Sequence, residues 1–188
     1  MLKNKHGFSM VELLAMIIIT SAIIFPLLTS LVDSFEVNSI MHDRKSAVTI
    51  TETTIYAFNK LSYQDLSNKV DTANANGDYY IELTEANCSI LVFPDDEDLC
   101  LRIFDTIWNN LTFDETTFRV FIYDYSLTQN QIDTLSTNTD IPSIVREDIA
   151  LLTEDTNIND DLLRIHVWIR YADGSFGETK QKGLINND

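Results

Sequence analysis

The twenty residues from 13 to 32 read LLAMIIITSAIIFPLLTSLV and contain no charged side chain. At about 1.5 Å per residue, a helix of this length is about 30 Å long, which matches the hydrocarbon core of a bilayer. The hydroxyl groups of its Ser and Thr residues can bond back to helix carbonyls. Pro26 removes one backbone hydrogen bond, so we expect a helix kink there, which membrane helices tolerate. The segment is therefore predicted to span a membrane once.

Charged residues flank this segment asymmetrically. Lys3 and Lys5 precede it, Asp33 and Glu36 follow it, and the next basic residue is Arg44. Because basic residues favour the cytoplasmic side, the N-terminus is predicted to stay in the cytoplasm. No small-x-small cleavage site of an ordinary secretory signal follows the apolar run. The pattern predicts a single-pass membrane protein with an extracellular head.

The sequence that leads into the span, from residue 3 to 18, reads KNKHGFSMVELLAMII and places a carboxylate at the edge of the predicted bilayer. Such a charge costs on the order of a few kcal/mol unless it is paired or functional. Cleavage after Gly7 would give Phe8 a free amino group, and Glu12 lies one helical turn further on. The two charges could then pair within one subunit or between neighbours. The alternative is that Glu12 extends to the lipid headgroups without a partner.

This string resembles the N-termini of type IV prepilins and of the pseudopilins of type II secretion and competence systems. Those chains share a short basic leader ending in Gly, then Phe, three residues, Glu and about twenty apolar residues. Gly7, Phe8 and Glu12 match the pattern, and the resemblance covers roughly residues 1–35. It implies that a prepilin peptidase cuts after Gly7 and N-methylates Phe8. It also implies that Glu12 forms an assembly salt bridge with the Phe8 amine of a neighbouring subunit.

The resemblance implies a structural subunit, a minor pilin or pseudopilin, in a cell-surface filament of a pilus, competence or secretion system. Its expected partners are other pilin or pseudopilin subunits, the prepilin peptidase, a membrane platform with a traffic ATPase, and the lipid bilayer. One alternative is a binding module at the filament tip, with an exposed aromatic patch on the head such as Tyr79, Tyr80, Tyr123 and Tyr125. The other alternative is a plain membrane-anchored extracellular domain with no filament.

The chain divides into four expected parts. They are a leader at 1–7, the membrane-spanning or filament-core half of a long helix at 8–32, its amphipathic half at 33–63, and a globular head at 64–188. Residues 33–62 contain no Gly or Pro, which favours one continuous helix. Its expected head-facing stripe comprises Val37, Ile40, Met41, Arg44, Val48, Ile55, Phe58 and Leu61.

The head is expected to be an antiparallel sheet of about four to six strands, which gives an α+β fold of the pilin-like kind. Alternating apolar residues predict strands at 79–84, 88–93, 117–125, 162–171 and about 175–185, with the first two forming a hairpin. The polar stretch 64–78, which ends in Asn-Gly-Asp, is interpreted as a loop. Residues 128–152 are expected to be helical or irregular, with a break at Pro142.

The two cysteines, Cys88 and Cys100, suggest a disulfide that closes a loop in an exported head. The alternative is a pair of unlinked thiols, with one or both buried in a strand. The run of Asp95, Asp96, Glu97 and Asp98 is most simply a solvated turn. Calcium binding is the weaker alternative, because hard oxygen ligands cluster in this way.

The composition argues against several functions. The formal charge is -16, from 13 Lys and Arg against 29 Asp and Glu, so nucleic acid is a poor partner for the head. The sequence shows no phosphate-binding Gly loop and no His with an evident nucleophile partner. We therefore expect neither an enzyme nor a cofactor, and we expect His166 to be an ordinary sheet residue.

Overall fold

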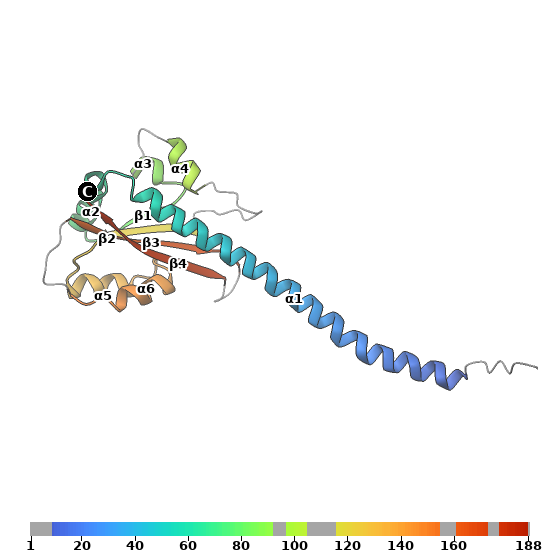
Figure 1. Ribbon diagram of the computed structural model, residues 1–188. Coiled ribbons are helices and arrows are strands. Elements are labelled where there is room, and N and C mark those ends of the chain that lie inside the picture. The colour runs from blue at the N-terminus through green and yellow to red at the C-terminus, as the bar shows by residue number, and fades with distance from the viewer. Residues whose placement is uncertain (1–8, 92–96, 105–115, 155–160, 173–176, 188) are drawn as a thin grey trace, which may run out of the picture. The chain divides into compact units, whose positions relative to one another are not determined.

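The computed structural model describes residues 9–91, 97–104, 116–154, 161–172 and 177–187. The chain has an α+β fold, with a long N-terminal helix α1 (Met10–Phe58) and a four-stranded antiparallel sheet (Figure 1). This architecture confirms the predicted pilin-like fold class. Two compact units, residues 1–41 and 42–188, divide the chain within α1.

In the first unit, the segment of α1 from residue 13 to 32 carries no charged side chain on any side. All of the large apolar side chains of α1 from Leu13 to Met41 are exposed. The helix is long and apolar enough to cross a membrane, by length and composition. The Ser21 hydroxyl donates to the Ile17 carbonyl at 2.6 Å, as expected for a hydroxyl in a membrane helix. The helix continues through Pro26 without a break, and a kink there stays a prediction.

The sheet of the second unit has the strand order β1-β2-β3-β4, and every neighbouring pair is antiparallel. The strands are β1 (Ile81–Leu83), β2 (Phe118–Asp124), β3 (Leu162–Arg170) and β4 (Glu178–Asn186). Their positions confirm the strands predicted at 117–125 and 162–171 and the closing strand near 175–185. Arg119 pairs with Trp168 across β2 and β3, and Trp168 pairs with Lys180 across β3 and β4.

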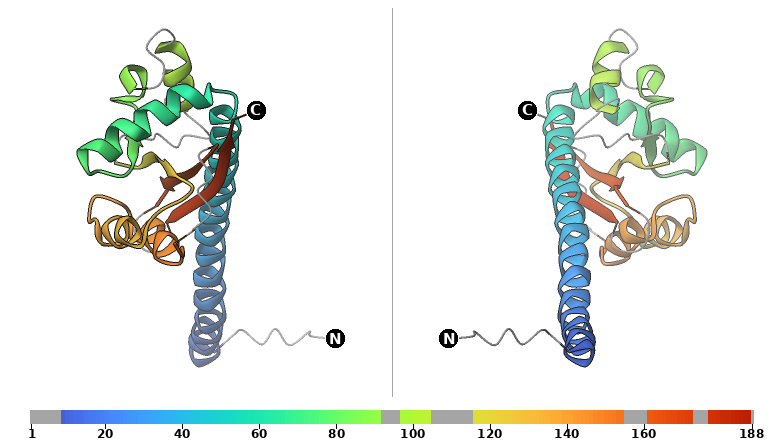
Figure 2. Two further views of the ribbon diagram at one scale, coloured as in Figure 1. Left: turned by 90° about the vertical axis from the view of Figure 1, so that its left-hand side faces the viewer. Right: turned by 90° about the vertical axis from the view of Figure 1, so that its right-hand side faces the viewer.

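Helices cover both faces of this sheet (Figure 1, Figure 2). Alternate residues of β2 enter two separate cores: Phe118, Val120 and Ile122 on one face, Phe121 and Tyr123 on the other. The first core includes residues of α1 and of α2 (Tyr63–Asn76), α3 (Cys88–Leu91) and α4 (Glu97–Phe104). The second core lies under α5 (Gln129–Thr137) and α6 (Ser143–Ala150). The segment 128–152, which was expected to be helical or irregular, therefore forms a pair of helices, with Pro142 at the start of α6.

The loop interpretation of 64–78 is wrong, because this stretch is the helix α2. The predicted helix end at 63 is also late, since α1 ends at Phe58 and the chain turns before Tyr63. Burial of Tyr63, Leu66, Val70 and Ala73 follows a helical spacing that the polar composition hides. Gly77, with φ of +88°, ends α2 in the left-handed conformation that glycine adopts easily.

The second half of α1 packs on the head through a face that overlaps the expected stripe only in part. Its buried residues are Ser46, Ala47, Ile50, Thr51, Thr54 and Phe58. Of the stripe, Phe58 is buried and Ile55 and Leu61 pack against the first core, whereas Arg44 is exposed. Small and hydroxyl-bearing residues suit this face, because the Thr54 hydroxyl bonds to the Ile50 carbonyl at 2.8 Å within the helix. Gly183 of β4 faces the same helix, where an added Cβ atom would lie 2.8 Å from Ile55 Cγ2.

The predicted hairpin between 79–84 and 88–93 does not form. The chain makes a turn after Thr84, and Cys88–Leu91 is the short helix α3. The apolar residues after Cys88 resemble a strand in composition. Such a short run cannot distinguish a buried helical turn from a strand by periodicity.

Candidate functional site

The first turn of α1 carries the sequence-predicted site. Gly7 and Phe8, the predicted cleavage and methylation positions, lie outside the described residues. Ser9 is the N-cap of the helix: its hydroxyl oxygen accepts a hydrogen bond from the Glu12 N–H at 3.2 Å. The Ser9 carbonyl accepts the first helical bond, from the Leu13 N–H, at 3.1 Å. A signal was available in the sequence, because Ser9 and Glu12 have the Ser-x-x-Glu spacing of a capping box.

These bonds place Glu12 in the first turn of α1. Glu12 is the third residue of α1 and is exposed. A carboxylate in the first turn is stabilised by the unpaired N–H groups and the positive end of the helix dipole. Glu12 therefore has a local structural role in addition to any ion pair. An exposed carboxylate at this position can form an ion pair with a cation near the start of the apolar helix.

The structure joins Cys88 and Cys100 by a disulfide between α3 and α4. Their Cα atoms are 5.8 Å apart, within the usual range for such a bond. Both residues are buried in the first core. The bond closes the connection that carries the acidic run.

The Cys88–Cys100 bond leads to a prediction for protein taken from its native membrane. Unfolded in urea without reductant, the chain should resist thiol alkylation, and reductant should expose two reactive thiols. Replacing both cysteines with Ser should lower the free energy of unfolding by about 2–4 kcal/mol, because the unfolded chain loses a constraint. Full labelling before reduction would show that the cysteines are unlinked.

The calcium candidate is not located by the structure. Asp95 and Asp96 lie outside the described residues, and for Glu97 and Asp98 only the backbone of α4 is described. Within the described ranges, no group of three or more His, Cys, Asp or Glu side chains is placed to hold a metal ion.

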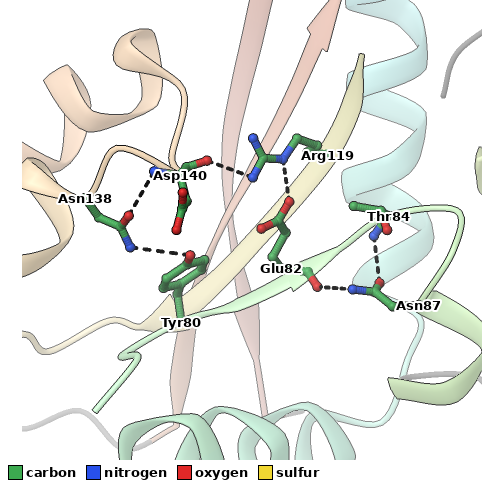
Figure 3. A network of polar contacts seen from close by, with 7 residues as sticks. All are labelled: Tyr80, Glu82, Thr84, Asn87, Arg119, Asn138 and Asp140. Carbon is green, nitrogen blue, oxygen red and sulfur yellow. Dashed lines mark hydrogen bonds and ion pairs between the residues drawn. The ribbon is translucent and has the colours of Figure 1, made fainter. Parts of the chain in front are cut away.

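A polar network on the head joins three elements (Figure 3). Arg119 of β2 forms an ion pair with Glu82 of β1 and donates to the Asp140 carbonyl at 2.7 Å. Asn138 donates to the Tyr80 hydroxyl at 3.4 Å and accepts from the Asp140 N–H at 2.9 Å. These bonds fasten the loop between α5 and α6 to the sheet.

A hollow of about 430 Å³ lies beside this network. Its charged lining consists of Glu82, Arg119, Asp140 and Arg170. The opposite charges are balanced, and Arg170 is itself paired with Glu178 at 3.3 Å. The hollow is therefore explained by the polar network beside it, which attaches the loop between α5 and α6 to the sheet.

The expected aromatic patch of a tip module does not form from the four tyrosines. Tyr123 is 1 % exposed and belongs to the second core, against which Tyr79 and Tyr80 also pack. The Arg164 guanidinium lies over the Tyr125 ring, with its central carbon 4.1 Å from the ring centre. A sequence cannot show which face of a strand is covered by later helices.

His166 lies in the second core, as a sheet residue. Its Nε2 is 3.2 Å from the Tyr123 hydroxyl, and Nδ1 is buried with no hydrogen-bond partner among the described residues. Burial lowers the pKa of His166 to about 4, against the smaller opposing effect of the Asp148 carboxylate. The ring is therefore neutral at pH 7, and burial disfavours uptake of a second ring proton.

The lowered pKa of His166 predicts acid sensitivity of the head. The unfolded state, with a His pKa near 6.5, binds the proton more strongly than the folded state does. Stability should therefore fall from about pH 6.5 and level off near pH 4, with a loss of roughly 1.5–2 kcal/mol between pH 6.5 and 5. Urea unfolding at several pH values tests this, with His166→Gln as the comparison. An unchanged pH slope in His166→Gln would contradict the assignment.

Comparisons of the chain with models of known protein families, with curated proteins and with solved structures found no match. The features that bear on function are therefore the N-terminal motif, the geometry of the first turn of α1 and the fold.

Proposed function

We propose that the chain is a structural subunit, a minor pilin or pseudopilin, of an extracellular filament of the type IV pilus, competence or type II secretion kind. The observation that carries the proposal is the order of Gly7, Phe8 and Glu12 directly before an uncharged twenty-residue span. The capped start of α1 supports it, because the Ser9 cap sets Glu12 in the first helical turn, close to Phe8 in sequence.

The proposed mechanism begins in the membrane. The basic leader holds the N-terminus in the cytoplasm while the head is exported. A prepilin peptidase removes residues 1–7 and methylates the new amine of Phe8. The subunit then leaves the bilayer and packs its apolar helix against those of other subunits.

Charge pairing sets the register of this packing. The Phe8 ammonium of an incoming subunit enters a low-dielectric core, where an unpaired charge is strongly unfavourable. The Glu12 carboxylate of a subunit already in place neutralises it. Exposed apolar side chains from Leu13 to Met41 supply the contact surface between helices.

The alternative functions make different demands on these residues. A plain membrane anchor needs the apolar span but not the glycine, phenylalanine and glutamate in this order. A tip adhesin would need a binding surface on the head, and the burial of Tyr123 weakens the patch that the sequence suggested.

Mechanical shearing tests the proposal. Filaments sheared from cells that carry a prepilin peptidase should contain the chain, and the same fraction from cells lacking the peptidase should not. A chain that remains wholly in the membrane fraction in both strains would contradict the filament assignment.

A further inference from the structure

The two edges of the sheet differ in how their backbone groups are satisfied. β1 is only three residues long, and the Asn87 side chain covers its outer edge (Figure 3). The Asn87 amide donates to the Glu82 carbonyl at 2.9 Å, and its oxygen accepts from the Thr84 N–H at 2.8 Å. One side chain thus takes the hydrogen bonds that an additional strand would make.

The β4 edge is long and regular. All nine residues from Glu178 to Asn186 pair with β3 in one register without a bulge. At the two ends, Tyr171 N–H bonds to the Gly177 carbonyl and Asn187 N–H bonds to the Asp161 carbonyl. Since hydrogen-bonded and non-bonded pairs alternate in an antiparallel ladder, the odd-numbered residues of β4 bond to β3.

It follows that the even-numbered residues of β4 direct their backbone groups away from the sheet. The N–H and C=O groups of Lys180, Lys182 and Leu184 form a row with the spacing that an added strand requires. In the parts of the chain that the structure describes, these outward groups have no backbone partner.

Side chains leave the same edge accessible. The Lys180 ammonium is held over α6, 2.8 Å from the Asp148 carboxylate and bonded to the Ile144 carbonyl. Lys182 is exposed, and Leu184 is 46 % exposed. Residues 42–188 contain 26 acidic and 11 basic side chains, so the exposed Lys182 places a positive charge on the edge of an otherwise acidic head.

The position of Lys182 disfavours pairing between two copies of this edge. Lys182 is the central residue of β4, so an antiparallel pair of fully overlapping β4 strands places one Lys182 opposite the other. Like charges directly opposite each other destabilise a strand pair. An acidic strand would instead be attracted to this position.

We infer that the β4 edge is a docking site for an extended acidic segment of a different polypeptide, which adds beside β4 as a fifth strand. Backbone hydrogen bonds to Lys180, Lys182 and Leu184 hold the segment. The Lys182 ammonium selects for an acidic side chain, and Leu184 contacts an apolar one. The inference depends on the sheet edge and does not require that the chain be a filament subunit.

The key variant is Lys182→Pro, which deletes an outward N–H without breaking a bond to β3. Lys182→Ala keeps the N–H and removes the charge, whereas Lys182→Glu keeps the N–H and reverses the charge. Fluorescence unfolding, which reports on buried Trp168, checks that each variant is folded. Lys182→Glu keeps the test valid should the proline variant not fold.

The first arm uses the full chain in detergent and a ten-residue peptide that alternates Glu and Val. Hydrogen exchange of the amides at 180, 182 and 184 should slow at least about tenfold with this peptide. It should not slow with the matched Lys-Val peptide, and protection should be lost in Lys182→Pro and Lys182→Glu. Equal protection by both peptides, or none by the Glu-Val peptide, would overturn the inference.

The second arm identifies the occupant in native membranes. A photo-cross-linking residue replaces Leu184, or in the control Leu151, which is 80 % exposed and lies outside β4. We expect an adduct with a different polypeptide at 184 only, reduced at least tenfold by Lys182→Glu. An adduct between two copies, an equal yield at 151, or no adduct at 184 would each overturn the inference. A chain that forms the expected adduct but is missing from sheared filaments would contradict the proposed function alone.

Discussion

Glu12→Ala is expected to abolish incorporation into filaments while membrane insertion and leader cleavage stay normal. In the proposed filament, loss of the carboxylate would leave the Phe8 ammonium of the neighbouring subunit buried and unpaired, at a cost of roughly 3–5 kcal/mol. Removing a first-turn carboxylate from a helix costs only about 0.3–1 kcal/mol through the helix dipole. The intersubunit charge therefore dominates the expected result. The assay is the ratio of the chain in sheared filaments to the chain in the membrane pool.

Two further variants separate the explanations for Glu12. Glu12→Gln should behave like the Ala variant if charge is essential, and like wild type if a hydrogen bond is sufficient. Glu36→Ala removes an exposed acid beyond the span and should assemble normally. Wild-type incorporation of Glu12→Ala would show that Glu12 serves only the first turn of its own helix or the lipid headgroups.

The second large effect concerns stability. Phe58→Ala should lower the free energy of unfolding of the head by about 3–5 kcal/mol, because it removes a fully buried ring and leaves a cavity. That loss is a large share of the 5–15 kcal/mol typical of a domain. Tyr56→Ala is the matched control, since Tyr56 lies two residues earlier on α1 and is 64 % exposed.

Denaturant unfolding of the full chain in detergent, followed by tryptophan fluorescence, measures both variants. The Tyr56→Ala midpoint should lie close to that of wild type. If Phe58→Ala unfolds at the wild-type midpoint, the last turn of α1 is not part of the core of the head.

The sequence was informative where periodicity is strong. The strand predicted at 117–125 forms as β2, and its residues from Phe118 to Tyr123 alternate between two faces. Burial of the second face, which carries Tyr123, was not predicted. Helix α2 was missed because its four buried residues are spaced among ten that are mostly polar. The short helix α3 was missed because a run of four residues, three of them apolar, carries no usable period.

The same contrast between local and long-range signals applies to the candidate site. The position of Glu12 follows from a local motif, and so does the Ser9 cap, which a search for Ser-x-x-Glu would have found. The pair of Arg119 and Glu82 joins residues 37 apart in sequence, through a strand register that no local pattern contains. The open edge of β4 likewise depends on the order of strands in the sheet.

The N-terminal mass of the chain isolated from its native membrane tests leader cleavage without any further assumption. We expect a mature chain that begins at Phe8, carries one N-methyl group and lacks residues 1–7. In cells without a prepilin peptidase, we expect the full leader. An intact Met1 in cells that carry the peptidase would contradict the proposal that the chain is a pilin-like subunit.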